Sequence, residues 1–185
     1  MLMQCEDGRF HQNTDFCRID FEPLAARHGG PDLGRILVTT FDNPWTSIVR
    51  FDMGDLIRLH PTGQCTCGRN EGFLVEAIEG RVANATFTTC GDLVTTMALD
   101  TRLAQIPEIR DYHLEQHNRT RYELLLILTD NSSGVLARIS QVLESLYGED
   151  GEYTLVVVSD ILPGPSEKYR RTQANFEFSQ KGLFE

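Results

Sequence analysis

The sequence predicts an α+β protein, with a small β-rich, barrel-like subdomain over residues 1–79 and a split β-α-β-β-α-β domain over residues 80–185. Two observations carry this prediction. The first half consists of short alternating or β-branched runs between turn residues, at spacings of about 8–12 residues that are typical of a small barrel or sandwich. The second half places segments of helical periodicity between strand-like runs, which is the order of a small antiparallel sheet with two helices on one face.

The first half is predicted to be a series of short strands. They are expected at residues 16–22, 35–41, 47–51, 55–60 and 73–78. In the first of them, Cys17, Ile19 and Phe21 alternate with charged residues, which indicates one buried and one exposed face. The run at 35–41 is continuous and β-branched, so a strand buried on both faces is expected there.

The second half opens with a short ribbon at residues 85–96, followed by a helix that Thr96 caps and Pro107 ends. The apolar residues on one face of this helix are Leu99, Leu103 and Ile106. A hairpin is expected next, because two strand-like runs flank the turn residues 118–120.

Residues 131–148 give the clearest helical pattern in the chain. Ser132 or Ser133 is expected to cap this helix, and Gly148 is expected to stop it. Its apolar residues recur at helical spacing: Val135, Leu136, Ile139, Val142, Leu143 and Leu146. A buried strand at residues 152–161 is expected to complete the domain.

Composition excludes several classes of function. The net charge of −10 and the pI of about 4.9 argue against a nucleic-acid groove, which needs a basic face, and against an anionic membrane surface. No apolar run approaches the roughly 18 residues of a membrane span, and the N-terminal residues do not resemble a signal peptide. Five cysteines without a secretory signal predict a cytoplasmic protein, where close cysteines are more often metal ligands or core residues than disulfides.

Five motifs follow one another along the chain: GRILVTT at 34–40, IVRFDMGD at 48–55, CTCGR at 65–69, IEGR at 78–81 and SEKYRRTQANF at 166–176. In this order they resemble the adenylate-forming acyl-CoA ligase superfamily, and most of all its phenylacetate–coenzyme A ligase branch. The resemblance implies that ATP and magnesium activate a small carboxylic acid, of the aryl or aryl-acetic class, as an acyl-adenylate. The acyl group would then be transferred to coenzyme A.

The resemblance also implies nucleotide-binding residues, namely Asp55, Arg50, Arg69 and Arg81. The Asp at position 55 would accept hydrogen bonds from both ribose hydroxyls, because a carboxylate offers two acceptor oxygens and no donor. Gly54 would let the backbone turn toward the cleft, and Arg81 matches the hinge arginine. The alternative is that these residues form exposed cross-strand ion pairs on a half-solvated sheet.

Lys168 matches the catalytic lysine of the superfamily, and Arg170 and Arg171 follow it as the motif requires. This lysine would polarise the carboxylate and the α-phosphate while the acyl-adenylate forms. A single flexible positive charge suits that role, because domain rotation can carry it in and out. The alternative is a solvated surface lysine.

A structural zinc site is expected from Cys5, His11, Cys65 and Cys67. Four nitrogen and sulfur ligands suit a closed tetrahedral zinc, which would tie the N-terminal segment to the Cys-x-Cys loop. The phenylacetate ligase branch often has a Cys and a Gly-Leu-His run near this position, and DGRFH at 7–11 is similar. Surface residues and a capped turn are the alternative.

The remaining cysteines and histidines are expected to be ordinary. Cys17 and Cys90 lie on strand-like stretches and are expected in the core. The other histidines have no partners at metal spacing and are expected at the surface: His28, His60, His113 and His117.

The motifs that precede these five in the family, among them a Ser/Thr/Gly-rich phosphate loop, have no match in this sequence. The chain is therefore expected to be the C-terminal part of such a ligase and inactive alone. It would work with the N-terminal adenylation domain, on the same or a separate chain.

Two other functions stay open. Residues 122–146 also resemble the ACT regulatory module, whose strand, D-x-x-G-V-L-A turn and helix bind amino acids at a dimer interface, so a homodimer is a further expectation. ACT modules do not carry the segments at 50–55 and 65–69. The third possibility is a zinc-stabilised interaction domain without a small-molecule ligand.

Overall fold

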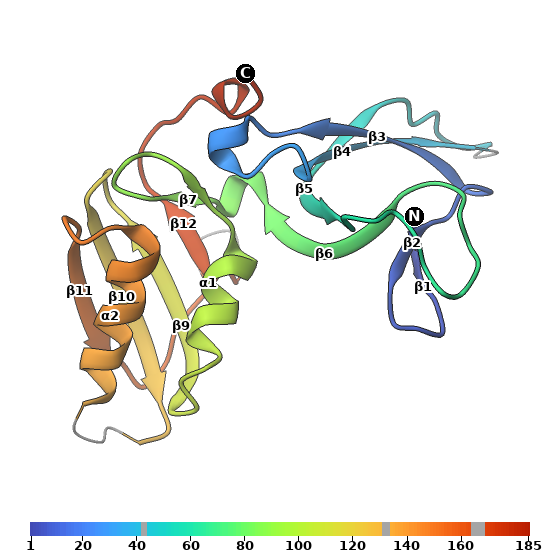
Figure 1. Cartoon of the computed structure of the whole chain (residues 1–185). Helices are drawn as coiled ribbons and strands as arrows, with labels where there is room; N and C mark the ends of the chain where they lie inside the picture. Colours follow the sequence, from blue (N-terminus) through green and yellow to red (C-terminus); the bar gives the residue numbers. More distant parts are fainter. Residues whose placement is uncertain (42–43, 131–133, 164–168) are drawn as a thin grey trace. The chain divides into compact units, whose positions relative to one another are not determined.

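The chain divides into two compact units in the computed structural model, which describes residues 1–41, 44–130, 134–163 and 169–185. The first unit consists of Met1–Val82 with Gln180–Glu185, and the second consists of Ala83–Ser179. The first is a curved sheet, and the second packs helices α1 and α2 on a separate sheet (Figure 1). The α+β fold class predicted from the sequence is therefore confirmed. None of the described helices is long and apolar enough to cross a membrane.

The first unit is an antiparallel sheet in the order β1-β2-β6-β5-β4-β3. Its strands are β1 (Leu2–Gln4), β2 (Phe10–Gln12), β3 (Cys17–Pro23), β4 (Leu33–Thr40), β5 (Phe51–Leu59) and β6 (Leu74–Arg81). The alternation predicted for β3 is confirmed at its start, where Cys17 and Ile19 are buried and Arg18 is exposed, but it fades at Asp20, Phe21 and Glu22, which are all partly buried. The double burial of β4 is confirmed as well, because neighbouring Ile36, Leu37 and Val38 are all buried.

Residues 47–50 are not in a strand, and a single strand, β5, runs from Phe51 to Leu59 through the break expected at 52–54, so the expectation of two strands at 47–51 and 55–60 is wrong. Opposite β4, Leu37 pairs with Asp52 and Arg35 pairs with Leu56, so Ile36 faces three residues of β5. This bulge contains Gly54, whose φ of 71° is readily available to glycine. The glycine therefore bends the strand without ending it.

Both ends of the chain add elements that the sequence did not predict. The hairpin β1–β2 joins the sheet because β2 pairs with β6. The last residues return to the first unit, although the predicted division placed them in the second half: Leu183 is buried, its carbonyl accepts from the N–H of Ala25, and Arg35 stacks over the Phe184 ring at 4.2 Å.

The second unit has a mixed sheet in the order β11-β10-β9-β12, with a separate ribbon of β7 and β8. Its elements are β7 (Thr86–Phe87), β8 (Leu93–Val94), α1 (Thr96–Leu103), β9 (Ile109–Gln116), β10 (Arg121–Leu128), α2 (Val135–Tyr147), β11 (Glu152–Val157) and β12 (Thr172–Ala174). The chain order β-α-β-β-α-β is present. However, β11 runs parallel to β10, and the unpredicted strand β12 runs parallel to β9. Among the described strands of this sheet, only β9 and β10 pair antiparallel, so the expectation of a purely antiparallel sheet is wrong.

The helices and the hairpin of the second unit follow the predicted periodicity. Leu99 and Leu103 of α1 join Val135, Ile139 and Leu143 of α2 in one core with β9 and β10. Ile106 is buried with them beyond the end of α1, whereas Leu136, Val142 and Leu146 are only partly buried. The strand at β11 was expected to be buried, but it lies at the sheet edge and Val157 is 43% exposed.

The caps of both helices differ from the prediction. The hydroxyl of Thr95, not Thr96, accepts from the backbone N–H of Ala98 at 3.1 Å, while Thr96 bonds to the Thr172 hydroxyl. In α2, Gly134 occupies the N-cap position, and Ser132 and Ser133 lie outside the described residues. Gly148 ends α2 as predicted.

Replacing Thr95 with alanine is expected to lower the free energy of unfolding by about 1 kcal/mol, because the first turn of α1 loses its side-chain acceptor. Serine at this position is expected to keep most of the stability. Urea unfolding followed by circular dichroism measures both. Thr101→Ala is the control, since its exposed hydroxyl only bonds back to the Met97 carbonyl within the helix. Equal losses for Thr95→Ala and Thr101→Ala would show that Thr95 is not a cap.

Candidate functional site

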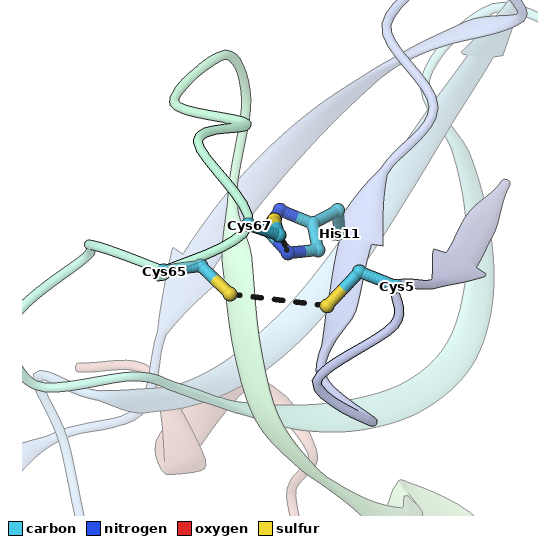
Figure 2. A group of neighbouring side chains, drawn as sticks. All are labelled: Cys5, His11, Cys65 and Cys67. Atoms are coloured by element: carbon cyan, nitrogen blue, oxygen red, sulfur yellow. Dashed lines mark hydrogen bonds between the residues drawn. The ribbon is translucent and has the colours of Figure 1, made fainter.

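The clearest cluster of chemically active side chains is formed by Cys5, His11, Cys65 and Cys67 (Figure 2). Cys5 lies in the turn between β1 and β2, His11 lies on β2, and both other cysteines lie in the loop between β5 and β6. The pairing of β2 with β6, in which His11 faces Leu74, carries the N-terminal hairpin beside this loop. The tertiary structure therefore brings together all four residues expected to hold a metal.

The cysteines lie in two turns of the same kind, Cys-x-x-Gly. Gly8 donates to the Cys5 carbonyl at 2.9 Å with a φ of 77°, and Gly68 donates to the Cys65 carbonyl at 3.3 Å with a φ of 80°. Such a turn needs the left-handed backbone conformation that glycine adopts without strain. Both turns direct a thiol toward the same point in space (Figure 2).

The distances within the cluster fit a tetrahedral metal. The sulfurs of Cys5 and Cys65 are 3.8 Å apart, and the sulfur of Cys67 is 3.5 Å from His11 Nε2. All four donor atoms lie within 4.8 Å of one another. A tetrahedral zinc with ordinary bond lengths would separate two sulfurs by about 3.8 Å and a sulfur from a nitrogen by about 3.5 Å. Three sulfurs and one imidazole nitrogen are also a donor set that zinc prefers.

Backbone N–H groups act on the charge state of the thiols. Burial raises the pKa of the Cys5 thiol, but the N–H groups of Arg9 and Asp7 and the neighbouring thiols outweigh it, so this pKa lies below its ordinary value. At Cys65, the N–H of Cys67 lowers the pKa, yet desolvation and the adjacent thiols raise it to about 11. Without a cation, the cluster therefore favours ionisation of one thiol over several.

Two of the residues expected to bind a nucleotide meet in the structure. Asp55 lies in the β5 bulge and pairs in register with Arg81 of β6, whose Nε donates to Asp55 Oδ1 at 3.1 Å. Arg81 directly precedes Val82, the last residue before the boundary between the two units.

Arg50 and Arg69 each form other ion pairs. Arg50 has a φ of 45° and bonds to Asp20 at 2.7 Å, whereas Arg69 bonds to Glu6 beside the cysteine cluster at 2.9 Å. These contacts are of the cross-strand and surface kind that the sequence offered as the alternative reading.

Lys168 lies outside the described residues, but the residues after it do not. The Tyr169 hydroxyl donates to the Tyr112 carbonyl at 3.2 Å, and Arg171 forms an ion pair with Asp100. His113 contacts the Arg170 carbonyl through Nδ1 at 2.6 Å. The expectation that His113 is an ordinary surface residue is wrong, because its side chain is only 13% exposed, and the same holds for His60, which lies beside Glu76. Alternation along β9 alone does not reveal the contact of His113 with Arg170, because its partner is distant in sequence.

Two further expectations are corrected by the structure. Cys90 is exposed in the turn between β7 and β8, although Cys17 is buried as predicted. His28 is buried next to Gly29 at the end of a short 3₁₀ turn, rather than lying on the surface. Both positions depend on turns that strand-like patterning does not predict.

The chain shares its fold with part of several solved ligases. The chain matches a solved 2-hydroxyisobutyryl-CoA ligase in the postadenylation state with 2-HIB-AMP, at 17% identity and a TM-score of 0.66 over 92% of this chain and 38% of that one. An open conformation of that ligase with 2-HIB-AMP and CoA matches at 19% identity and a TM-score of 0.52, over 83% of this chain and 35% of that one. A mutant coronafacic acid ligase from Pectobacterium brasiliense matches at 16% identity and a TM-score of 0.51, over 81% of this chain and 30% of that one.

At these identities the likeness establishes a shared fold. The chain spans 38% of the length of the first of these ligases. No family model and no curated protein sequence matches the chain.

Proposed function

We propose that this chain is the C-terminal part of an acid–CoA ligase that activates a small carboxylic acid as an acyl-adenylate and transfers it to coenzyme A. The observation that carries the proposal is the fold match over 92% of the chain to a ligase solved with an acyl-AMP. Its proposed partner is an N-terminal adenylation domain, on the same or a separate chain. ATP with magnesium supplies the adenylyl group.

Asp55 is the proposed ribose ligand. Its Oδ1 accepts from Arg81, and a carboxylate has further acceptor capacity for ribose hydroxyls. The bulge around Gly54 supports this role, because bulges commonly re-aim a side chain at the edge of a site. Arg81 would hold the carboxylate in place, while Arg50 and Arg69 would reach the nucleotide only by giving up their present partners.

The phenylacetate–coenzyme A ligase branch is the proposed subfamily, with an aryl or aryl-acetic acid as substrate. What supports it is the Cys-Thr-Cys-Gly-Arg loop at 65–69 and its convergence with Cys5 and His11. We propose that this cluster binds a structural zinc, which would fix the N-terminal hairpin to the loop between β5 and β6.

The proposed nucleotide role of Asp55 predicts a measurable change in the affinity for an acyl-adenylate. In NMR titrations with a non-hydrolysable acyl-adenylate analogue, signals of Asp55 and Arg81 are expected to shift. Asp55→Ala is expected to weaken binding by about tenfold to a hundredfold, because charge-assisted hydrogen bonds to the ribose are lost.

Glu76→Ala is the matched control, since that carboxylate of β6 forms a longer ion pair with Arg9 at 3.7 Å. Unchanged affinity in Asp55→Ala would remove the ribose assignment. If amino acids instead shift signals around α2 and nucleotides shift none, the ACT-like regulatory module becomes the better account.

A further inference from the structure

The segment after Lys168 is held on the sheet of the second unit by a pair of side chains. Strands β11 and β12 lie at opposite edges of this sheet. Tyr112 and Leu114 of β9 face the helices in the core. His113, which lies between them, therefore faces the opposite side of the sheet.

His113 and Glu115 contact both ends of β12. His113 Nδ1 lies 2.6 Å from the Arg170 carbonyl, and its Nε2 lies 3.1 Å from Glu115 Oε1. The other oxygen of Glu115 accepts from the Asn175 side chain at 3.0 Å. Because a backbone carbonyl only accepts hydrogen bonds, the contact with Arg170 calls for a donor at Nδ1.

We infer that His113 is a positioning residue that, with Glu115, sets the place of β12 and so of the segment that begins after Lys168. Strand β12 spans only Thr172–Ala174, so its backbone ladder alone is a weak anchor. The contacts of Arg170 and Asn175 flank this short strand on either side. We call the contacts of His113 and Glu115 with Arg170 and Asn175 the clamp. The existence of the clamp does not depend on the proposed role of Lys168, whereas its catalytic meaning rests on that role.

A positioned segment matters because misplacement of a reacting group by about 1 Å costs about a hundredfold in rate. The lysine proposed to act lies two residues before the Arg170 carbonyl in the sequence. Other contacts hold the same segment, namely the ion pair of Arg171 with Asp100 and the bond of Thr172 to the Asn84 carbonyl at 2.6 Å. The linked pair of His113 and Glu115 adds side-chain bonds on both sides of β12, to Arg170 before it and to Asn175 after it.

Two substitutions at one position separate the halves of the clamp. In His113→Asn, the amide nitrogen stands near the position of Nδ1 and keeps a donor for the Arg170 carbonyl. In His113→Gln, the amide nitrogen stands near the position of Nε2, so the donor to Arg170 is lost. His117→Gln is the control, because His117 pairs with Glu123 and its backbone N–H bonds to the Arg121 carbonyl in the hairpin.

The measurement is amide hydrogen exchange by NMR on the whole chain. The reporters are the N–H groups of Leu114, which donates to the Arg171 carbonyl, and Asn175, which donates to the Gln116 carbonyl. His113→Gln is expected to speed their exchange by about fivefold to tenfold, while His113→Asn stays within about twofold of the unmodified protein. The amide of His117 is expected to stay unchanged in both variants.

The clamp is overturned if His113→Gln and His113→Asn speed the exchange of these amides equally, whether by local opening or by unfolding. It is also overturned if neither variant speeds the exchange. The exchange result is independent of activity. If the clamp holds but replacing Lys168 does not slow adenylate formation, the proposed catalytic function fails and the clamp remains. In an active assembly, the clamp further predicts that adenylate formation is slower in His113→Gln and restored in His113→Asn.

Discussion

Protein purified without added metal is expected to carry about one equivalent of zinc, and Cys67→Ser is expected to lower this to less than a tenth of an equivalent. A hydroxyl is a much poorer zinc ligand than a thiolate, and the three remaining donors leave the tetrahedron open. The prediction follows from the distances of 3.8 and 3.5 Å within the cluster, which match the edges of a zinc–thiolate–imidazole tetrahedron.

The stability of the first unit should follow the metal. A bound zinc would link Cys5 to Cys65, which are 60 residues apart in sequence. A cross-link that closes a loop of this length is worth about 4 kcal/mol in the chain-entropy account. Chelation or Cys67→Ser is therefore expected to destabilise this unit by an amount of that order, and the N-terminal hairpin should lose protection first.

Elemental analysis and thermal unfolding with and without a chelator are the measurements. Cys90→Ser is the control, because that thiol is exposed in the other unit and lies outside the cluster. Metal-free protein whose melting temperature does not respond to zinc, to chelator or to Cys67→Ser would contradict the prediction.

Lys168→Ala is expected to slow acyl-adenylate formation by about 10²-fold or more in the ligase assembled with its adenylation domain. This is the scale of removing one preorganised electrostatic group at a developing charge. Transfer of the acyl group from a preformed adenylate to coenzyme A is expected to stay nearly unchanged, because the family resemblance implies that the domain carrying Lys168 is rotated away for the second step. The chain alone is expected to show no pyrophosphate exchange.

Single-turnover assays of the two half-reactions separate these outcomes. Lys181→Ala provides the matched control, since it is the other lysine of the chain and its exposed side chain pairs with Glu185. Equal rates for Lys168→Ala and the unmodified ligase in both half-reactions would remove the catalytic assignment and leave the fold.

Local sequence patterns determined the parts of this protein that depend on neighbouring residues. The apolar spacing of α2 and its stop at Gly148 were predicted correctly, as was the hairpin of β9 and β10 about residues 118–120. In that turn the Asn118 side chain accepts from the N–H groups of Thr120 and Arg121, a bond that needs only adjacent residues. The four proposed metal ligands were also named from residue type, from the short spacings of Cys5 to His11 and of Cys65 to Cys67, and from the resemblance to the ligase branch.

Tertiary structure alone decided which distant segments lie together. The pairing of β2 with β6 carries His11 to the cysteine loop, and the register of β5 with β6 places Asp55 opposite Arg81. The parallel pairing of β12 with β9 brings Arg170 to His113, a residue that was expected at the surface because it has no partner at metal spacing. Such pairings are selected by burial and backbone hydrogen bonding across the whole sheet, which contribute free energy only once the remote strands have met.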